Sequence, residues 1–314
     1  MALTIGVDIG GTKVAAGVVD EQGAVVARTR RETPGHDVVE TEDIIIDAVG
    51  ELAAGHDVVA VGIGAAGWIA SDRATVLFSP HLAWRNEPLR AALANRIGLP
   101  LIVENDANAA AWAEYRFGSA RGHSVVVCVT LGTGIGGGIV INGALYRGAF
   151  GVAGEFGHMT VVPEGRRCAC GNLGCLEMYA SGRALARDAS ELAAESPAAA
   201  ARMVEMAGSV DGLTGPIVTA AARQGDPAAI SLCVSMGRWL GRGLANLAAA
   251  LDPSIFAIGG GVSEAGELML RPAQIEFAHT LTGRGFRPEA QVVIASLGAD
   301  AGLVGAADLA RHLD

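Results

Sequence analysis

Lysine and aromatic residues are scarce in this chain of 314 residues. Lys13 is the one lysine among 23 basic residues, and the others are arginines. The formal net charge is −10, so the sequence lacks the basic surface that nucleic-acid binding requires. The hydrophobic content of 51% still supplies the apolar side chains for a substantial core, and the length favours two lobes.

The sequence also lacks the features of a secretory signal or a membrane span. Its start, MALTIGVDIGG, has no basic segment, and Asp8 interrupts the apolar run. Residues 124–146 carry no charge, but they include six glycines and Asn142, which fits two β-strands around a glycine turn better than a spanning helix. We therefore expect no membrane association and a cytoplasmic location, where thiols stay reduced.

Apolar β-type runs alternate with alanine-rich helical segments along the chain, which predicts an α/β fold. Asp226 and Pro227 form a helix start signal, because Asp caps helices well and Pro suits their first position. The stretch 191–223 should form surface helices. The predicted strands are 3–8, 14–19, 24–28, 58–63, 101–104, 125–131, 138–141, 255–258 and 292–295, and the predicted helices are 38–54, 88–96, 107–117, 227–250, 264–277 and 301–312.

Two glycine-rich turns repeat one pattern, a strand followed by the turn and a second strand. The first glycine loop is DIGGTK, residues 8–13, and the second is TLGTGIGG, residues 130–137. This internal repeat suggests two related lobes that face each other across a cleft. We expect the boundary between them near residues 116–121.

The first glycine loop has the composition of a phosphate-binding turn. Gly10 and Gly11 let backbone N–H groups approach an anion, and Thr12 and Lys13 add a hydroxyl and a cation. Asp8, at the end of a strand, could hold Mg²⁺ directly or through water. A tight hairpin with a solvated lysine explains the same residues, because glycine turns are common.

The second glycine loop contains the spacing G-x-G-x-x-G, which a dinucleotide fold would place at the start of a helix. Here it continues as GIVINGALY, which is rich in β-formers, so a hairpin that presents N–H groups and Thr133 to a phosphate fits better. A third glycine loop, Gly259, Gly260 and Gly261, could border a flat ring such as adenine, or be an ordinary strand-to-helix turn. A P-loop motif is absent from the sequence.

The segment ENDAN, residues 104–108, follows a buried strand and opens a helix. Asn105 and Asp106 are good helix caps, which explains them without any chemistry. Strand ends of α/β sheets are also where ligands bind, and a carboxylate there could accept a proton from an attacking hydroxyl group. The sequence leaves both interpretations open.

Three of the five cysteines lie close together behind a histidine. Nine residues separate His158 from Cys168, one separates Cys168 from Cys170, and four separate Cys170 from Cys175. A disulfide would leave one cysteine unpaired, and a catalytic thiol would not need three. Four nitrogen and sulfur ligands predict a closed, structural Zn²⁺ site. Cys128 and Cys233 lie in apolar segments and should be buried thiols.

Taken together, these motifs resemble the ROK family of sugar kinases and repressors, and within it the bacterial ATP-dependent glucokinases. The match covers nearly the whole chain, and its most specific part is CACGNLGCLE, residues 168–177. The resemblance implies a two-lobed, actin-like ATPase (ribonuclease H-like) α/β fold with a zinc-containing loop in the larger lobe. The smaller lobe would be residues 1–116, joined by the C-terminal helix 301–314, and the larger lobe 117–300.

The resemblance also implies roles for individual residues. Asp106 would be the general base, and the cofactors would be ATP, Mg²⁺ and a structural Zn²⁺. The sugar ligands would be Gly67, Asn105, Asp106, Glu155, His158 and Glu177; the nucleotide and Mg²⁺ would be held by Asp8, Gly10, Gly11, Thr12, Lys13, Thr133, Gly134, Gly259, Gly260 and Gly261; and His158, Cys168, Cys170 and Cys175 would hold the zinc. Ala66 and His81 replace the residues that the family often has there, and we expect no ligand role for His81.

The activity that the resemblance implies is phosphoryl transfer from ATP to the 6-hydroxyl group of glucose, in a homodimer or homotetramer. The alternatives are a kinase for fructose, N-acetylglucosamine or N-acetylmannosamine, and a polyphosphate-using glucokinase. A sugar-responsive repressor is disfavoured, because seven residues before Asp8 leave no room for a DNA-binding domain.

Overall fold

The structure is a computed structural model that describes residues 2–312, and the last two residues of the expected range 301–314 lie outside it. The chain divides into two compact units. The first unit comprises Met1–His123, Gly138–Gly154 and Ser296–Asp314; the second comprises Ser124–Gly137 and Glu155–Ala295. The first unit thus contains residues 117–123, 138–154 and 296–300 besides the ranges expected for the smaller lobe.

A five-stranded sheet with the order β3-β2-β1-β4-β8 forms the centre of the first unit. Strands β1, β2 and β3 are antiparallel neighbours, whereas β4 and β8 run parallel to β1. The strands are β1 (Leu3–Ile9), β2 (Lys13–Val19), β3 (Val25–Glu32), β4 (Val58–Ala65) and β8 (Leu101–Asn105). The first glycine loop is therefore the β1–β2 hairpin turn, and ENDAN spans the end of β8 and the residues that follow it.

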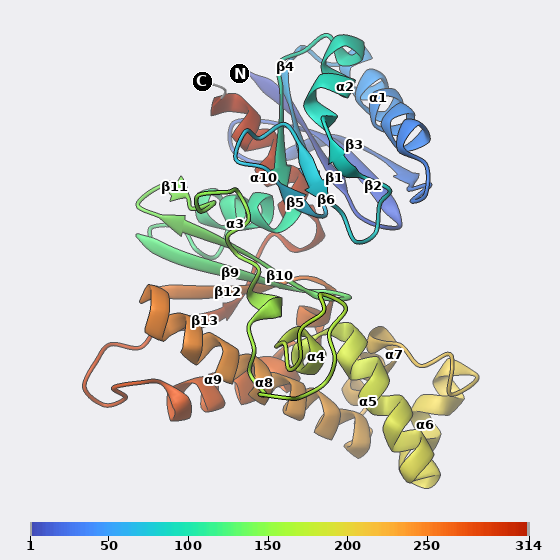
Figure 1. Cartoon of the computed structure of the whole chain (residues 1–314), viewed down its shortest axis with the longest axis vertical. Coiled ribbons are helices and arrows are strands. Elements are labelled where there is room, and N and C mark those ends of the chain that lie inside the picture. The colour runs from blue at the N-terminus through green and yellow to red at the C-terminus, as the bar shows by residue number, and fades with distance from the viewer. Residues whose placement is uncertain (1, 313–314) are drawn as a thin grey trace. The chain divides into compact units, whose positions relative to one another are not determined.

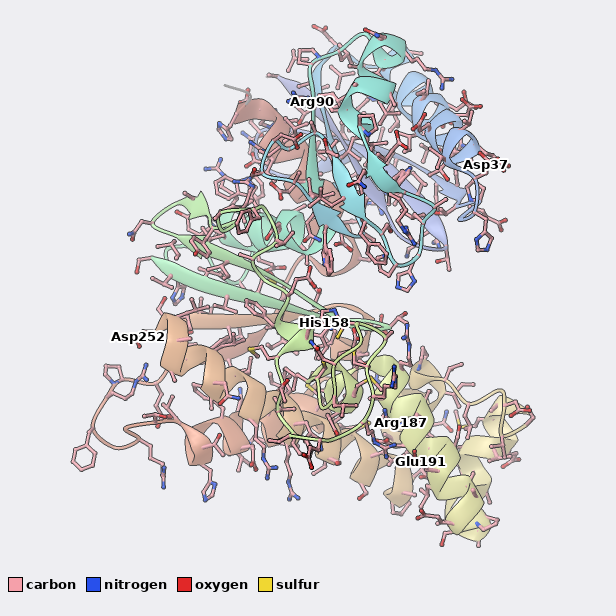
Figure 2. All side chains as sticks on the ribbon, in the orientation of Figure 1. Asp37, Arg90, His158, Arg187, Glu191 and Asp252 are labelled. Carbon is pink, nitrogen blue, oxygen red and sulfur yellow. The ribbon has the colours of Figure 1, made fainter. Side chains whose placement is uncertain are left out.

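Helices cover both faces of this sheet (Figure 1). The core between the sheet and helices α1 and α2 contains Ile5, Val7, Ile45 and Leu93, all fully buried or nearly so. The helices of the unit are α1 (Val38–Ala54), α2 (Leu89–Ile97), α3 (Asp106–Arg116) and α10 (Ala301–Leu309), with short 3-10 turns at Gly298–Asp300 and Ala310–His312. Asp37, labelled in Figure 2, starts α1 by accepting a hydrogen bond from the backbone N–H of Glu40.

Helix α10 packs against the first sheet at the distance of direct backbone contact. A Cβ atom at Gly6 would collide with the carbonyl oxygen of Leu303, and one at Gly62 with that of Ala306. Gly305 meets the backbone of Ala109 on α3 in the same way. Because glycine has no side chain, helices α10 and α3 can settle against the strands that present Asp8 and Asp106.

A second five-stranded sheet has the order β11-β10-β9-β12-β13. Strand β12 runs parallel to both β9 and β13, and β10 is antiparallel to β11, so the strand order and these strand directions repeat those of the first sheet. Its strands are β9 (Val125–Leu131), β10 (Ile135–Ile141), β11 (Ala144–Leu145), β12 (Ile255–Gly259) and β13 (Gln291–Ile294). The duplication expected from the two glycine loops is present in the topology.

The second unit is mostly helical outside its strands. Helices α8 and α9 pack against each other along their lengths (Figure 1). Its helices are α4 (Glu177–Ala180), α5 (Gly182–Glu195), α6 (Pro197–Ala207), α7 (Gly215–Arg223), α8 (Pro227–Leu251) and α9 (Glu267–Thr280), with 3-10 turns at Phe156–His158 and Gly261–Ala265. Asp226 caps α8 through the backbone N–H of Ala229, which confirms the predicted start signal.

Most predicted elements are present, with shifted ends. The strand predicted at 138–141 begins three residues earlier, at Ile135, and the predicted helix 264–277 divides into a 3-10 turn and α9. A small sheet of β5 (Trp68–Ile69), β6 (Val76–Phe78) and β7 (Arg85–Glu87) was not predicted, because two or three residues carry no periodic signal. Among the described residues, no helix is both long and apolar enough to cross a bilayer.

Candidate active site

The first glycine loop is a tight turn whose ends are pinned by backbone hydrogen bonds. The N–H of Gly10 donates to the carbonyl of Lys13 over 2.9 Å, and the hydroxyl of Thr33 donates to the carbonyl of Gly10, also over 2.9 Å. The side chain of His81 lies against Gly11, where a Cβ atom would come within 2.8 Å of the histidine Cβ. Thr12 and Lys13 are exposed at this turn, so a ligand can reach both side chains.

Asp8, the last residue but one of β1, points toward the first turn of α10. A Cβ atom at Gly302 would come within 3.0 Å of its carboxylate oxygen, so the glycine makes room for this side chain. Burial and, to a smaller extent, the negative charge of Asp106 raise the pKa of Asp8 against the opposing effect of Lys13, to about 7 in all. The charge of Asp106 therefore acts on the carboxylate of Asp8 within the first unit.

Asp106 is the first residue of α3, directly after β8. Its carboxylate accepts a hydrogen bond of 3.1 Å from the side-chain amide of Asn105. Burial raises the pKa of Asp106 against the lowering effect of backbone N–H groups at the start of α3, to about 6 in all. A carboxylate with a pKa near neutrality is ionised in the cell and still basic enough to accept a proton.

Asn105 is the cap of α3, as one of the two sequence interpretations proposed. Its side-chain oxygen accepts from the N–H of Asn108 over 2.9 Å, and its amide donates to the carbonyl of Gly67 over 3.0 Å. Gly67 has a φ of 144° and no space for a Cβ atom beside Ser79. The structure therefore brings together Gly67, Asn105 and Asp106, three residues that the sequence analysis linked only through resemblance.

A buried ion pair that the sequence analysis did not predict supports the junction between β8 and α3. Glu104, 2% exposed, accepts from Arg147 over 2.6 Å and from the side-chain amide of Asn108 over 3.0 Å. Arg147 lies in the segment that follows β11, 43 residues from Glu104 in sequence. No local pattern could have paired the two, although a charged residue in an otherwise apolar strand indicated a partner.

The second unit contains the cysteine loop, residues 158–175, with the four predicted metal ligands. His158 (Figure 2), Cys168, Cys170 and Cys175 place one ligand atom each so that all four lie within 4.8 Å of one another. Sγ of Cys170 lies 3.7 Å from Sγ of Cys175, and Nδ1 of His158 lies 3.7 Å from Sγ of Cys168. Zn–S bonds of about 2.3 Å in a tetrahedron separate their sulfur atoms by about 3.8 Å, so this cluster fits a zinc ion.

The ring of His158 has two differently engaged nitrogen atoms. Nδ1 faces the cysteines, whereas Nε2 lies 3.8 Å from a carboxylate oxygen of Glu155. Burial and the neighbouring thiols raise the pKa of Cys175 to about 12, so an adjacent cation would be required to hold it as a thiolate. The donor set is that of a four-coordinate structural site.

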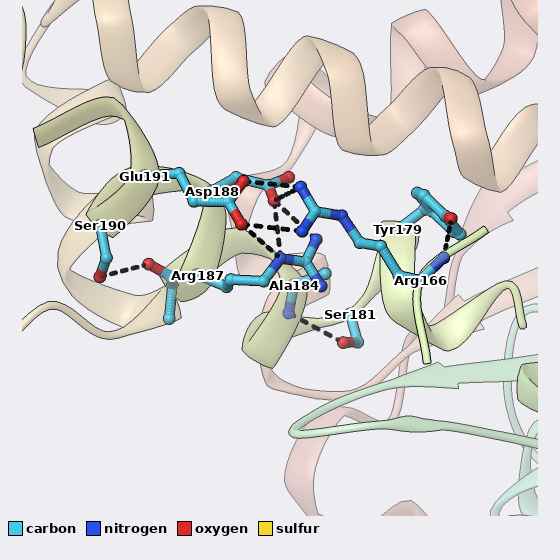
Figure 3. A network of polar contacts seen from close by, with 9 residues as sticks. Arg166, Tyr179, Ser181, Ala184, Arg187, Asp188, Ser190 and Glu191 are labelled. Atoms are coloured by element: carbon cyan, nitrogen blue, oxygen red, sulfur yellow. Dashed lines mark hydrogen bonds and ion pairs between the residues drawn. The ribbon is translucent and has the colours of Figure 1, made fainter. Parts of the chain in front are cut away.

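Arg166 anchors the cysteine loop to α5. Its guanidinium donates two hydrogen bonds, of 2.8 and 2.6 Å, to the carboxylate of Glu191, and it lies 3.9 Å from Asp188 (Figure 3). Its backbone N–H donates to the hydroxyl of Tyr179 over 2.8 Å. These groups are partly exposed, so the network orients the loop more than it stabilises the fold.

The second glycine loop also lies within the second unit and is held from two sides. The N–H of Gly182, which opens α5, donates to the carbonyl of Gly132 over 2.9 Å. The carboxylate of Glu177 accepts from the N–H of Ile135 over 3.1 Å. Thr133 is exposed between these two attachments. The third glycine loop packs on the same strand end, where Gly260, with a φ of 83°, leaves no space for a Cβ atom beside Leu131.

The predicted site residues thus fall into two groups, one on each unit. The first group lies at and just after the ends of strands in the first sheet. The second group lies in or beside the cysteine loop and in the second and third glycine loops. The first unit contains Asp8, Gly10, Gly11, Thr12, Lys13, Gly67, Asn105 and Asp106, and the second contains Thr133, Gly134, Glu155, His158, Cys168, Cys170, Cys175, Glu177, Gly259, Gly260 and Gly261.

The repeated sheet order and the glycine hairpins define an actin-like ATPase fold, in the form found in sugar kinases. The family model described as "ROK family" matches residues 4–313. A glucokinase of Streptomyces coelicolor is 51% identical over 319 residues, which cover 100% of this chain and 99% of that protein. This chain therefore belongs to the ROK family.

Solved structures give the same assignment. A ROK family glucokinase from Streptomyces griseus, in complex with glucose and AMPPNP, matches with a TM-score of 0.92 and 56% identity, over 99% of this chain and 100% of that one. A ROK hexokinase from Thermus thermophilus matches with a TM-score of 0.82 and 35% identity, over 98% of each chain. The fold and family predicted from the sequence are confirmed.

Proposed function

We propose that this protein is an ATP-dependent glucokinase that converts glucose and ATP to glucose 6-phosphate and ADP. The observation that carries the proposal is the full-length likeness, at 56% identity, to a glucokinase whose structure holds glucose and AMPPNP. The environment of Asp106 supports it, because a phosphoryl acceptor needs a base near its hydroxyl group.

In the proposed reaction the 6-hydroxyl oxygen of glucose attacks the γ-phosphorus of ATP. A new O–P bond forms as the bond to the β,γ-bridging oxygen breaks, and ADP leaves with that electron pair. Asp106 takes the hydroxyl proton, which contributes on the order of 10²–10⁴ in rate. Its hydrogen bond from Asn105 holds the accepting carboxylate in one orientation.

The two exposed glycine hairpins would bind the phosphates. Thr12, Lys13 and Thr133 offer hydroxyl groups and a cation, the glycine N–H groups of both hairpins offer further donors, and the third glycine loop would border the adenosine. Asp8 offers the carboxylate oxygen atoms that Mg²⁺ binds. Its raised pKa indicates that its negative charge is unfavourable there unless a cation lies beside it. A bound Mg²⁺ would neutralise charge that develops on the transferring phosphoryl group.

The sugar would be held by the side chains grouped around Asp106 and the cysteine loop. Asn105 and Gly67 would contribute from the first unit, and Glu155, His158 and Glu177 from the second. The Cys168, Cys170, Cys175 and His158 cluster would hold a Zn²⁺ that keeps this loop in shape, without an open position for chemistry.

Several further properties belong to the same proposal. The segments 1–116 with 301–314, and 117–300, would move as lobes that close on the substrates, exclude water and so suppress ATP hydrolysis. We further propose a cytoplasmic homodimer or homotetramer, by resemblance to the family. The acidic net charge of −10 supports a protein without a nucleic-acid partner.

A coupled assay across a panel of hexoses tests the substrate. With ATP as donor, glucose should give the highest kcat/KM, well above fructose, N-acetylglucosamine and N-acetylmannosamine, and polyphosphate should be a poor donor. A preference for another sugar would overturn the glucose assignment, and absence of phosphorylation of every sugar would overturn the kinase assignment.

Replacing the base tests the mechanism. Asp106→Ala should keep glucose binding within about an order of magnitude and lose at least about 10²-fold in kcat, because a positioned base is worth that much. Turnover would be measured by the coupled assay and glucose binding by calorimetry. Turnover close to that of the wild type would sink the assignment of Asp106.

A further inference from the structure

We propose that Glu177 is a positioning residue for the second glycine loop, through which the cysteine loop supports nucleotide binding as well as sugar binding. The inference rests on the proposed function and adds a second role to a residue expected to contact only the sugar. All the residues involved lie in the second unit.

One carboxylate oxygen of Glu177 faces the second glycine loop. Oε2 accepts a hydrogen bond of 3.1 Å from the N–H of Ile135, the buried residue at which the loop becomes strand β10. The same oxygen occupies the space that a Cβ atom at Gly134 would need. The loop backbone therefore lies directly on this carboxylate, and Gly134 permits the contact.

The other oxygen faces the cysteine cluster. Oε1 lies 3.8 Å from Sγ of Cys168, and Glu177 follows Cys175 by two residues at the start of α4. The N–H of Leu176 donates to the carbonyl of Met159 over 2.8 Å, which fixes the chain just before Glu177. The carboxylate thus connects the metal-ligand cluster to the glycine loop.

The first part of the second glycine loop is attached to α5, and Glu177 holds the end of that loop at Ile135. Gly182 and Arg183 donate backbone hydrogen bonds of 2.9 and 3.3 Å to the carbonyls of Gly132 and Thr133. Gly157, beside His158, packs on Ile135, where a Cβ atom would come within 3.0 Å of the isoleucine Cβ. A loop fixed at both ends loses less conformational freedom when a phosphate binds, so its affinity for nucleotide is higher.

The sign of the expected effect separates positioning from charge. Glu177 brings a negative charge close to a loop expected to bind anionic phosphates, so removing that charge should by itself tighten nucleotide binding. Loss of the hydrogen bond to Ile135 should weaken it. A weaker Kd in a variant without the carboxylate therefore reports the positioning role.

The experiment measures binding of AMPPNP with Mg²⁺ by calorimetry, with no sugar present. Glu177→Ala should raise Kd about fivefold to tenfold, the loss expected for one part-buried hydrogen bond. Glu177→Gln keeps an acceptor oxygen for Ile135 and should stay within about twofold of the wild type. Glu164→Asn is the control, because it removes an exposed charge of the cysteine loop at a residue whose φ of 57° is one that Asn tolerates. This variant should not weaken AMPPNP binding.

A second variant acts from the loop side and does not depend on the folding of Glu177→Ala. Gly134→Ala places a methyl group against the Glu177 carboxylate and should also raise Kd. In the double variant the methyl group has no carboxylate to displace, so its effect should be smaller than the product of the two single effects. Zinc content and thermal unfolding, measured in parallel, should match those of the wild type.

Two results would overturn the inference. One is an AMPPNP Kd that Glu177→Ala leaves unchanged while glucose affinity falls, which would make Glu177 a sugar ligand alone. The other is an equal loss in Glu177→Gln and Glu177→Ala. A wild-type protein that binds AMPPNP but phosphorylates no glucose would remove the proposed function and leave this test intact.

Discussion

At the scale of single residues, Asp8 and Asp106 show how burial sets chemical function. Both lie where apolar strands end, and both have pKa values raised mainly by burial. Asp106 has an amide donor and helix N–H groups, whereas Asp8 faces a second negative charge. This difference suits Asp106 to accept a proton near neutral pH and Asp8 to hold a cation.

The raised pKa of Asp106 predicts an effect on stability. Its pKa of about 6 in the folded protein, against an ordinary value of 3.8 for aspartate, gives a stabilising contribution that is complete below about pH 4 and lost as pH rises through about 6. Asp106→Asn should therefore stabilise the nucleotide-free protein at pH 8, on the order of 2 kcal/mol, and by about half as much at pH 5. Urea unfolding at both pH values measures this difference.

The matched control is Asp57→Asn, at an exposed aspartate. Its effect on stability should be the same at pH 5 and pH 8. The same ionisation should make kcat/KM of the wild type fall as pH drops below about 6, because the base becomes protonated. An Asp106→Asn variant without any gain in stability at pH 8 would contradict the raised pKa.

At the scale of elements, the cysteine loop is a segment with little regular structure that is organised by its ends. Two isolated β-bridges, Thr160 with Cys175 and Arg167 with Leu173, are its regular pairings. Arg166 fastens it to α5, and the four metal ligands converge inside it. In such a loop, binding of the metal ion supplies the folding free energy that a hydrophobic core would otherwise provide. Loss of the ion should therefore disturb every residue that the loop positions.

We therefore expect Cys170→Ser to lose most of the zinc and to weaken glucose binding by about tenfold or more, since ligand loss is felt strongly by a structural site. Metal analysis of the purified protein and glucose calorimetry measure the two effects. Cys233→Ala, which removes a buried thiol in α8 away from the cluster, should retain zinc. Normal zinc content in Cys170→Ser would contradict the structural zinc site.

At the scale of the whole molecule, one buried carboxylate binds two segments of the first unit that lie close in sequence to the crossings between the units. Glu114, fully buried in α3, accepts from the N–H of Ser119 over 2.8 Å and from the N–H of Leu297 over 2.7 Å. The chain enters the second unit after His123 and returns at Ser296. The helix that begins with Asp106 thus carries, near its other end, the carboxylate that binds both of these segments.

Glu114→Ala should destabilise the protein by about 3 kcal/mol, because it removes a buried carboxylate and leaves two part-buried backbone N–H groups without their acceptor. Thermal and urea unfolding measure the loss. Glu195→Ala, at an exposed glutamate near the end of α5, should change stability by less than about 0.5 kcal/mol. Equal stability of the two variants would show that Glu114 is dispensable.

The sequence by itself determined what depends on residue type and short spacing. The glycine hairpins, the Asp226 cap, the strand β9 from Val125 to Leu131 and the Cys/His ligand set each lie within a few residues, where side-chain chemistry and backbone sterics decide the structure. Resemblance added the roles of Asp106 and the sugar ligands, which no local pattern distinguished from a helix cap.

Only the tertiary structure decided which distant segments meet. It paired Glu104 with Arg147, assigned residues 138–154 to the first unit, set α10 against Gly6 and Gly62, and placed Glu177 under the second glycine loop. The physical reason is that these contacts depend on close packing and on buried charges finding partners, which are properties of the folded chain and not of any short stretch of it.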